Sequence, residues 1–344
     1  MHMGVILPAL SLAIVHIAGD NIAVVPAMAL LLGNGIYSTV FFAYMVFGSI
    51  VAGMSAWIGV KSRHELTAVV KQLFGLRGKI LLALAVLAVS LPASALTGGY
   101  FAGQLIQNLT GIPSIWAIPI YIAVCCLLAA DFGQELLRIS NYVALLLIPT
   151  IGIMLTLLID TNTSVSFSHL LTIDYISWPL VIALIGYNAG GMRSILIVET
   201  GTYFSHKNYT GVYLAVLAKI FEGLFTLLLA HIALLGGGYG FMPLSTVANQ
   251  IFSSWLAVSF NSILVCILLN TMVPAMLVNA KQLSTITNLH FKIALPLAGL
   301  IVWGGSLISL DLILLIMSAT GLLMIAFITL VAYSLHKQGG KKLH

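Results

Sequence analysis

His16 and Asp20 are the residues in the first long apolar run whose types and spacing could do chemistry. They are four positions apart, so an α-helix would place both side chains on one face, one turn from each other. A carboxylate at the centre of a bilayer costs about 2.5–3.5 kcal/mol to insert, which favours a functional role. Asp20 could bind an amine, Na⁺ or a metal ion, or carry a proton with His16 as a relay. The alternatives are an internal ion pair of Asp20 with Arg193 or Lys219, and a packing role for His16.

Glycines and amides interrupt this run and one other run near their middles. The first reads Ala18-Gly19-Asp20-Asn21, and the second reads Gly186-Tyr187-Asn188-Ala189-Gly190-Gly191. Each glycine weakens a helix by about 1 kcal/mol relative to alanine. Backbone groups freed inside a bilayer are tolerated only where they line a cavity or are buried in protein. The pattern predicts two broken helices at a binding site, and the alternative is that these glycines let helices pack closely.

Other charged residues within apolar runs are candidates for ion pairs and gates. Lys219 and Glu222 have the i, i+3 spacing of a helical ion pair and are expected to pair with each other. Arg193 and Glu199 lie towards one end of their run and are candidate residues of an inner gate. His231 is expected to be structural.

Tyr100, Gln104 and Gln107 form a polar face on another run, each about one turn from the next. This face could hydrogen-bond a polar ligand or a neighbouring helix. The sequence contains no Ser-His-Asp order, HExxH motif, Walker loop or clustered Cys/His set, so we predict neither an enzyme nor a resident metal cofactor.

The composition requires lipid as the main solvent of the helices that carry these residues. Of the 344 residues, 60% are hydrophobic and only 7% are charged, and the mean hydropathy is +1.11. Soluble domains carry about 25% charged residues. Apolar runs of about 18 or more residues recur and alternating strands do not, so helices must satisfy the backbone hydrogen bonds. We therefore predict an all-α polytopic membrane protein whose basic residues, scattered over loops, do not bind nucleic acid.

A helix of about 20 apolar residues crosses a bilayer, and the sequence accommodates ten such spans. Their predicted bounds are near 5–32, 36–60, 78–107, 114–130, 137–159, 175–200, 210–236, 251–280, 291–308 and 310–335. Together they form one transmembrane domain over residues 1–344, with halves at about 5–159 and 175–335.

Lysine and arginine positions predict the orientation of these spans. Twelve of the 14 basic residues fall in loops after even-numbered spans or in the C-terminal tail. Loops rich in Lys and Arg stay in the cytoplasm. Both termini are therefore expected to be cytoplasmic, in an inner or plasma membrane, which requires an even number of spans.

The two interrupted spans are the first and the sixth, so each opens one half of a five-plus-five arrangement. An odd number of spans in each half gives the two halves opposite orientations. Interrupted helices at corresponding places in two inverted halves are the sequence signature of a transporter binding site.

This arrangement resembles the LeuT-type fold of the amino acid–polyamine–organocation superfamily. The segments Gly59-Val60-Lys61-Ser62-Arg63 and Phe74-Gly75-Leu76-Arg77-Gly78 are similar to the loop between helices two and three of nucleobase:cation symporters. Tyr187-Asn188 and the chain length resemble the short YkvI-like membrane proteins of the same superfamily. Gly19-Asp20-Asn21 resembles the Asp-Pro-Gly-Asn break of Nramp metal transporters. This chain lacks that proline and the Met-Pro-His run of the sixth helix, where it offers only Met192.

The resemblance implies a substrate site between helices one and six, flanked by helices three and eight. The implied substrate-binding residues are Ala18, Gly19, Asp20, Asn21, Tyr100, Gln104, Gly186, Tyr187, Asn188 and Gly190. The implied ion-coupling residues are His16, Asp20, Ser259, Ser262 and Thr271. The last three hydroxyls would complete a sodium site, and polar contacts between helices are their alternative role. A metal site would instead use Asp20, Asn21 and Met192.

The leading hypothesis is an H⁺- or Na⁺-coupled symporter that imports a small polar organic nutrient, such as an amino acid or nucleobase, by alternating access. The alternatives are a divalent-metal transporter and a membrane receptor that keeps the transporter fold. The expected partners are the lipid bilayer and a small-molecule substrate. Apart from the coupling ion, we expect no cofactor and no obligate protein partner.

Overall fold

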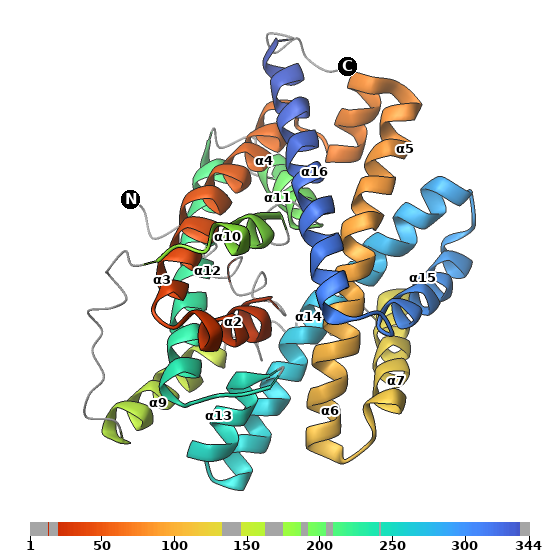
Figure 1. Cartoon of the computed structure of the whole chain (residues 1–344). Coiled ribbons are helices and arrows are strands. Elements are labelled where there is room, and N and C mark those ends of the chain that lie inside the picture. The colour runs from red at the N-terminus through yellow and green to blue at the C-terminus, as the bar shows by residue number, and fades with distance from the viewer. Residues whose placement is uncertain are drawn as a thin grey trace.

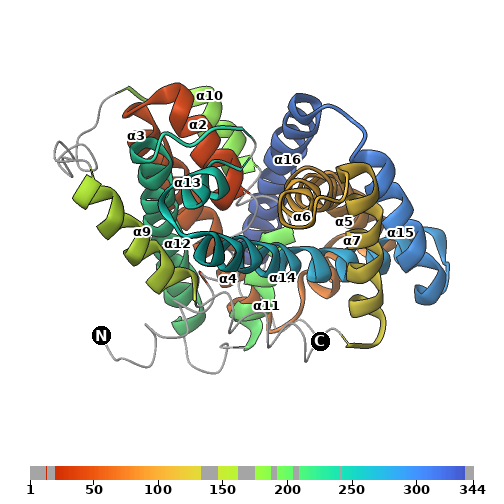
Figure 2. The same cartoon turned by 90° about the horizontal axis from the view of Figure 1, so that it is seen from below.

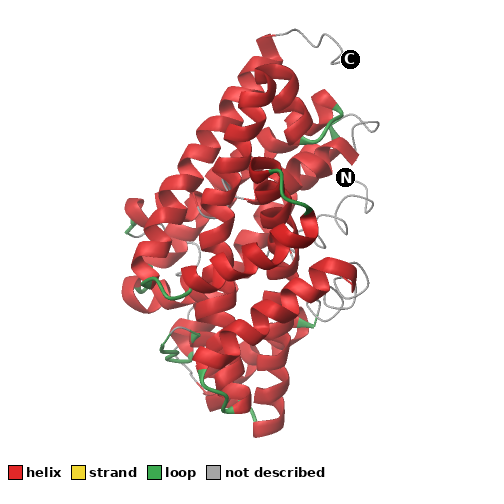
Figure 3. Ribbon diagram, turned by 90° about the vertical axis from the view of Figure 1, so that its right-hand side faces the viewer, coloured by secondary structure: helices red, strands yellow, loops and turns green. Residues whose placement is uncertain are grey.

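The computed structural model describes residues 13, 20–132, 146–161, 175–186, 192–203, 209–240 and 242–337. Over these ranges the chain consists of helices and connecting loops, without a β-strand (Figure 3). The predicted all-α class is therefore confirmed for the part of the chain that the structure describes.

The elements up to residue 132 alternate between α-helix and wider, π-helical stretches, which carry the label η. In chain order they are η1 (Asp20–Val24), α2 (Val25–Leu32), α3 (Gly35–Val40), η2 (Phe41–Gly48), α4 (Ser49–Ser62), α5 (Leu66–Ala95), η3 (Leu96–Ala102), α6 (Gly103–Thr110), α7 (Ser114–Leu127) and η4 (Leu128–Phe132). The elements after them are α9 (Leu147–Thr161), α10 (Trp178–Leu184), α11 (Met192–Tyr203), α12 (Thr210–Leu235), α13 (Pro243–Ile251), α14 (Ser254–Thr287), α15 (Phe291–Gly305) and α16 (Leu310–Lys337).

Five described helical stretches are long and apolar enough to cross a membrane. They are Gly35–Ser62, Leu66–Thr110, Thr210–Leu235, Ser254–Thr287 and Leu310–Lys337. Four shorter apolar helices overlap further predicted spans, namely Asn21–Leu32, Ser114–Ala130, Leu147–Leu158 and Phe291–Gly305. Parts of the first, fifth and sixth predicted spans lie outside the described residues, so the count of ten stays a prediction.

Large apolar side chains cover the outside of the bundle. Trp255 is 84% exposed, Leu31 76% and Leu307 70%. Large side chains of this kind are usually withdrawn from water. With five membrane-length helices, this surface identifies an integral membrane protein.

The third span begins earlier than predicted, because α5 starts at Leu66 rather than at residue 78. Leu66, Val69 and Val70 are buried while Lys71 is exposed, which is the pattern of an amphipathic helix lying against the protein. At Gly75 the backbone takes φ 70° and ψ −163°, a conformation that side-chain-bearing residues avoid. The chain turns there into the apolar span, and hydropathy alone detects only that span.

Helices distant in sequence form the contacts that organise the bundle. α12 packs against α2 and α4, and α11 packs against α4. α14 packs against α5 and also against α15, its neighbour in sequence, while α16 lies along α5 and α4. Viewed from below, α2, α3, α10 and α12 lie on one side and α5, α6, α7 and α15 on the other (Figure 2). The turn between α4 and α5 and the end of α16 lie at the opposite end of the molecule from α13 and the α6–α7 turn (Figure 1).

Glycines allow backbone to touch backbone at two places, between α4 and α11 and between α16 and the segment that follows α10. A β-carbon on Gly59 would overlap the carbonyl oxygen of Val198, and one on Gly201 would overlap that of Ala56. A β-carbon on Gly321 in α16 would overlap the carbonyl oxygen of Gly186. Small residues serve the same purpose at many membrane helix interfaces. The packing explanation therefore applies to Gly186, whatever else that residue does.

Candidate functional site

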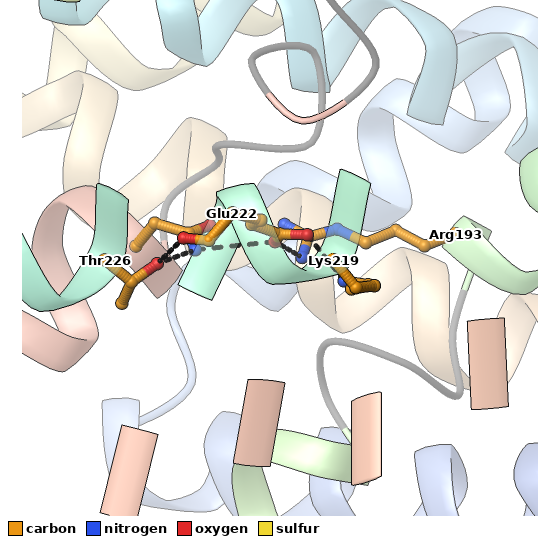
Figure 4. Close-up of polar contacts among 5 residues, drawn as sticks. Arg193, Lys219, Glu222 and Thr226 are labelled. Carbon is orange, nitrogen blue, oxygen red and sulfur yellow. Dashed lines mark hydrogen bonds and ion pairs between the residues drawn. The ribbon is translucent and has the colours of Figure 1, made fainter. Parts of the chain in front are cut away.

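Glu222 is the centre of a buried polar cluster near the middle of α12. Its Oε2 accepts a bond from Lys219 Nζ at 2.7 Å, and its Oε1 accepts one from Arg193 Nη1 at 2.7 Å. The side chains of Glu222 and Lys219 are 0% and 1% exposed, and that of Arg193 is 12% exposed. Figure 4 shows Arg193 reaching from α11 towards the carboxylate on α12. The predicted Lys219–Glu222 pair is confirmed, and Arg193 joins it.

Asn21 brings the first helix into this cluster. Its Nδ2 donates to Thr226 Oγ1 at 2.6 Å and lies 3.4 Å from Glu222 Oε1. Thr226 in turn donates from Oγ1 to the backbone oxygen of Glu222 at 2.7 Å (Figure 4). Asn21 and Thr226 are fully buried. The cluster thus joins η1, α11 and α12, which belong to the predicted first, sixth and seventh spans.

Close packing against η2 encloses the cluster from another side. Lys219 Nζ lies 5.9 Å from the centre of the Tyr44 ring, within the range of a cation–π interaction. A β-carbon on Gly223 would lie 2.6 Å from Met45 Cγ and 3.2 Å from Tyr44 Cβ. The absence of a side chain at Gly223 therefore allows η2 to approach α12 beside Glu222.

The described members of the cluster comprise two cationic side chains and one carboxylate. Moving ions out of water is costly, and good geometry with further hydrogen bonds is needed to offset that cost. Glu222 meets this need with contacts to Arg193, Lys219 and Asn21. When the helices move, the Glu222 carboxylate can exchange one hydrogen-bond partner for another. A ligand that bonds to Glu222 or to one of its partners can likewise replace an existing contact.

Several predicted site residues lie outside the described residues. They are His16, Ala18, Gly19, Tyr187, Asn188 and Gly190, and the same holds for the side chains of Asp20 and Met192. The backbone of Asp20 opens η1, directly before Asn21. Of the predicted substrate residues, the structure therefore brings Asn21 into the cluster.

Tyr100 and Gln104 lie in another part of the bundle, on η3 and α6. The Tyr100 hydroxyl donates to the backbone oxygen of Ile308, and both side chains are half-buried. Gln107 is exposed, and its Oε1 accepts a bond from Ser114 N at 3.1 Å. Tyr100 and Gln107 thus have contacts with neighbouring segments, which was one of the two predicted roles of this face.

The three hydroxyls predicted for a sodium site are not grouped together on α14. Ser259 and Ser262 are exposed, and they donate to the carbonyl oxygens of Trp255 and Val258 at 2.9 and 2.8 Å. Thr271 is half-buried, and its Oγ1 lies 3.4 Å from Ile267 O. Both serines bond to carbonyl oxygens of their own helix, so these bonds are neither the predicted sodium site nor the predicted contact between helices.

The remaining candidates are placed near one end of the bundle or between helices. Glu199 is exposed on α11, with Glu65 and Lys281 close enough to affect its carboxylate electrostatically. His231 Nδ1 and the Tyr37 hydroxyl are hydrogen-bonded at 2.7 Å between α12 and α3. His231 therefore has the structural contact that was expected of it.

Thr226 was not predicted as part of the site. It lies four positions after Glu222, one helical turn further along the same face, and this spacing is the signal that could have identified it. Its partner Asn21 is 205 positions away in sequence, and such a contact has no local signature. Among the residues that the structure describes, no group of three or more His, Cys, Asp or Glu side chains could hold a metal ion.

Comparison with known proteins identifies the fold. No protein-family model matches the chain, and no curated protein matches it either. Mhp1 in its inward-facing conformation is similar with a TM-score of 0.62 and 16% identity, over 87% of this chain and 69% of Mhp1. Mhp1 closed on bromovinylhydantoin, described as a nucleobase-cation-symport-1 family transporter, gives 0.60 and 16%, over 95% and 75%. The Eremococcus coleocola manganese transporter gives 0.58 and 12%, over 92% and 75%. The chain has the fold of the LeuT-type transporters.

Proposed function

We propose that this protein is a secondary active transporter that couples H⁺ or Na⁺ to the import of a small polar organic nutrient, such as an amino acid or nucleobase. The observation that carries this proposal is the fold shared with Mhp1 over 95% of the chain. The substrate would bind between the first and sixth helices and reach each side of the membrane by alternating access. Both termini would be cytoplasmic, as the distribution of Lys and Arg requires.

Reciprocal helix contacts support two inverted halves of five spans. If spans one to five correspond to spans six to ten, a contact between one and seven implies a contact between six and two. The α2–α12 and α11–α4 contacts are such a pair. The α15–α5 and α14–α7 contacts form a second pair, and the α16–α4 and α12–α9 contacts form a third. An internal two-fold relation of this kind underlies rocking between two states in many transporters.

The Glu222 cluster supports a coupling role for the first and sixth helices. The Glu222 carboxylate contacts Asn21 of η1 and Arg193 of α11 at the same time. Movement of either helix would therefore break one of these two contacts and change the charge environment of the carboxylate. Asp20 precedes Asn21 directly, which places a second carboxylate in the adjacent chain position. We assign coupling to Asp20 together with His16, and substrate contacts to the glycines and amides of both breaks.

Uptake into proteoliposomes tests this proposal. Purified protein is reconstituted and supplied with radiolabelled amino acids and nucleobases under an inward H⁺ gradient, an inward Na⁺ gradient or no gradient. The proposal predicts accumulation of at least one solute under one gradient and no accumulation without it. Binding of a solute without gradient-driven flux would instead support the receptor alternative.

Divalent-metal transport is the second candidate, favoured by the similarity to the manganese transporter. It would use Asp20, Asn21 and Met192 as ligands. The fixed positive charges of Arg193 and Lys219 argue against a further cation in the Asn21 region, because like charges repel. Uptake of Mn²⁺ that is lost in Asp20→Ala would favour this candidate over the organic solute.

A further inference from the structure

Two neighbouring helices carry exposed basic side chains at the same end of the molecule, where α5 starts and α16 ends (Figure 1). Arg77 lies near the start of the long apolar part of α5, and Lys337 is the last residue of α16. Neither has an acidic partner among the residues that the structure describes, because the ion pairs there are those of Glu222. Such bases help to orient membrane helices, and their surroundings decide whether they also bind something.

Two contacts hold α5 and α16 side by side. Thr320 Oγ1 donates to the backbone oxygen of Ala88 at 3.2 Å, and the ring centres of Phe74 and Phe327 are 6.3 Å apart. We call the line along which the helices meet at these residues the α5–α16 seam. Because Thr320 lies in the middle third of α16, it and Ala88 mark a common level near the centre of the bilayer.

Helix geometry places both bases at the depth of lipid head groups. Arg77 is 11 residues before Ala88, or about 16 Å along α5, and Lys337 is 17 residues after Thr320, or about 25 Å along α16. The hydrocarbon of one leaflet is about 15 Å thick, and its head groups add about 5–8 Å. Arg77 therefore reaches the inner edge of the head-group layer, and Lys337 reaches its outer edge.

On the bilayer side of Arg77, α5 exposes an apolar stripe. Its members recur at the spacing of one helix face, while Leu82 and Val86 between them are buried. The stripe consists of Leu81, Leu84 and Ala88. Leu81 is 55% exposed, and Ala88 is the residue that contacts Thr320. The stripe that begins at Arg77 therefore runs along the seam.

A matching stripe on α16 ends at Lys337. Leu323 and Leu330 precede Lys337 at intervals of seven residues, or about two helical turns, and both are exposed. Tyr333, one turn before Lys337, is 62% exposed. Tyrosines gather where a membrane meets water, because the ring is apolar and the hydroxyl is polar. Along α16, apolar, aromatic and basic side chains thus follow one another in the order of the layers of a leaflet.

The charges at this end of the molecule favour an anionic ligand. Residues 61–79 contain one acidic residue, Glu65, and five basic residues, Lys61, Arg63, Lys71, Arg77 and Lys79. Bases near a membrane surface attract anionic lipids, and Arg and Lys both bind phosphate well. A water-soluble anion could not use the apolar stripes, and a lipid without net charge gains less from the bases. An anionic phospholipid uses both.

We propose that the α5–α16 seam binds one anionic phospholipid, whose phosphate lies between Arg77 and Lys337 and whose acyl chains lie along the leucines of both helices. The site shares no residue with the Glu222 cluster and does not depend on the transport function. A lipid bound to both helices stabilises the folded protein, because it binds the native state and not the unfolded one.

Native mass spectrometry and thermal unfolding of the purified full-length protein test this site. The probes are dioleoyl phosphatidylglycerol, dioleoyl phosphatidylcholine and glycerol phosphate, which separate the charge of the head group from the acyl chains. The test variant is Arg77→Gln/Lys337→Gln, and Arg77→Lys/Lys337→Arg keeps both charges. Lys71→Gln/Lys292→Gln is the charge-matched control, because Lys71 is on the exposed face of the amphipathic start of α5 and Lys292 is exposed at the start of α15.

The proposal predicts that the wild type retains phosphatidylglycerol more tightly than phosphatidylcholine and unfolds at a higher temperature in its presence. Arg77→Gln/Lys337→Gln should weaken this binding by about 30-fold, since each base near a membrane surface contributes about five-fold. The charge-matched control and the variant that keeps both charges should bind as the wild type does. High concentrations of NaCl should weaken wild-type binding, because salt screens the attraction.

Four results would overturn the proposal: equal affinity for phosphatidylcholine, equally strong binding of glycerol phosphate, unchanged binding in Arg77→Gln/Lys337→Gln, or an equal loss in the charge-matched control. If Arg77→Gln/Lys337→Gln does not fold, the salt dependence of the wild type decides, since binding that salt does not weaken contradicts a charged site. Uptake into proteoliposomes is a separate measurement, so its failure would leave the lipid site standing.

Discussion

Among the described side chains of the cluster, Glu222 takes part in both of the buried ion pairs. It contacts two cationic side chains, whereas Lys219 and Arg193 each contact this one carboxylate. Removing one member of a buried ion pair costs about 3–5 kcal/mol, because the remaining charge is left uncompensated. The cost should therefore depend strongly on which member is removed.

Glu222→Gln should lower the unfolding temperature more than Lys219→Met does. The amide leaves both cations without this carboxylate, while loss of Lys219 leaves the Arg193–Glu222 contact in place. Thermal unfolding in detergent measures the difference, with Glu222→Gln expected to cost about 3–5 kcal/mol. A Lys219→Met protein that is equally or less stable than Glu222→Gln would show that the carboxylate is not the centre of the cluster.

Asp20→Asn should abolish gradient-driven uptake while leaving the protein folded. An amide keeps the shape of the side chain but can neither carry a proton nor attract a cation as a carboxylate does. Asp311→Asn is the matched control, because Asp311 is an exposed carboxylate in the first turn of α16. Full uptake by Asp20→Asn would contradict a coupling role of Asp20 and would favour the sixth helix or Glu222 as the coupling site.

At this scale the sequence predicts chemistry better than it predicts contacts. The i, i+3 spacing of Lys219 and Glu222 was sufficient for their ion pair, because a helix fixes that geometry locally. The bonds of Glu222 to Asn21 and Arg193 depend on how three helices meet, and no local spacing encodes them.

Among the elements, the contact between α4 and α11 leaves no room for added volume on either helix. Gly59 and Gly201 face the backbone of the other helix so closely that a single methyl group would overlap a carbonyl oxygen. Backbone atoms cannot rotate away as a side chain can. These helices belong to the predicted second and sixth spans, so their packing also fixes the position of Arg193.

Gly201→Ala should destabilise the protein by about 1–3 kcal/mol or more and reduce uptake, because α11 must shift away from α4. Gly304→Ala is the matched control, since a β-carbon there would have no heavy atom within 4 Å. Unfolding temperature and uptake of both variants give the comparison. If the two alanine variants behave alike, the close contact of these helices is wrong.

Hydropathy predicted the long helices because bilayer thickness imposes their length, as the ranges Thr210–Leu235 and Leu310–Lys337 illustrate. It missed the helical start of α5, which is short and amphipathic and obtains its stability from packing rather than from an apolar run. The extension of α14 to Thr287 was missed for the same reason, since its last turns leave the apolar segment.

For the whole molecule, the proposed inverted repeat of two halves would allow one chain to open alternately to two sides. Several contacts between helices recur between their proposed counterparts in the other half, as for α2–α12 and α11–α4. Two arrangements related by such a repeat are close in energy, which is what alternating access requires. The two predicted breaks lie largely outside the described residues and stay predictions, whereas the fold shows which of the described helices meet.

Accumulation against a concentration gradient tests the central claim of coupled transport most directly. Proteoliposomes receive the labelled solute mixture at equal concentration inside and outside, and an inward H⁺ or Na⁺ gradient is then imposed. The account predicts that the internal concentration of at least one solute rises above the external one and returns to it when an ionophore collapses the gradient. Equal concentrations throughout, for every solute and both ions, would contradict it.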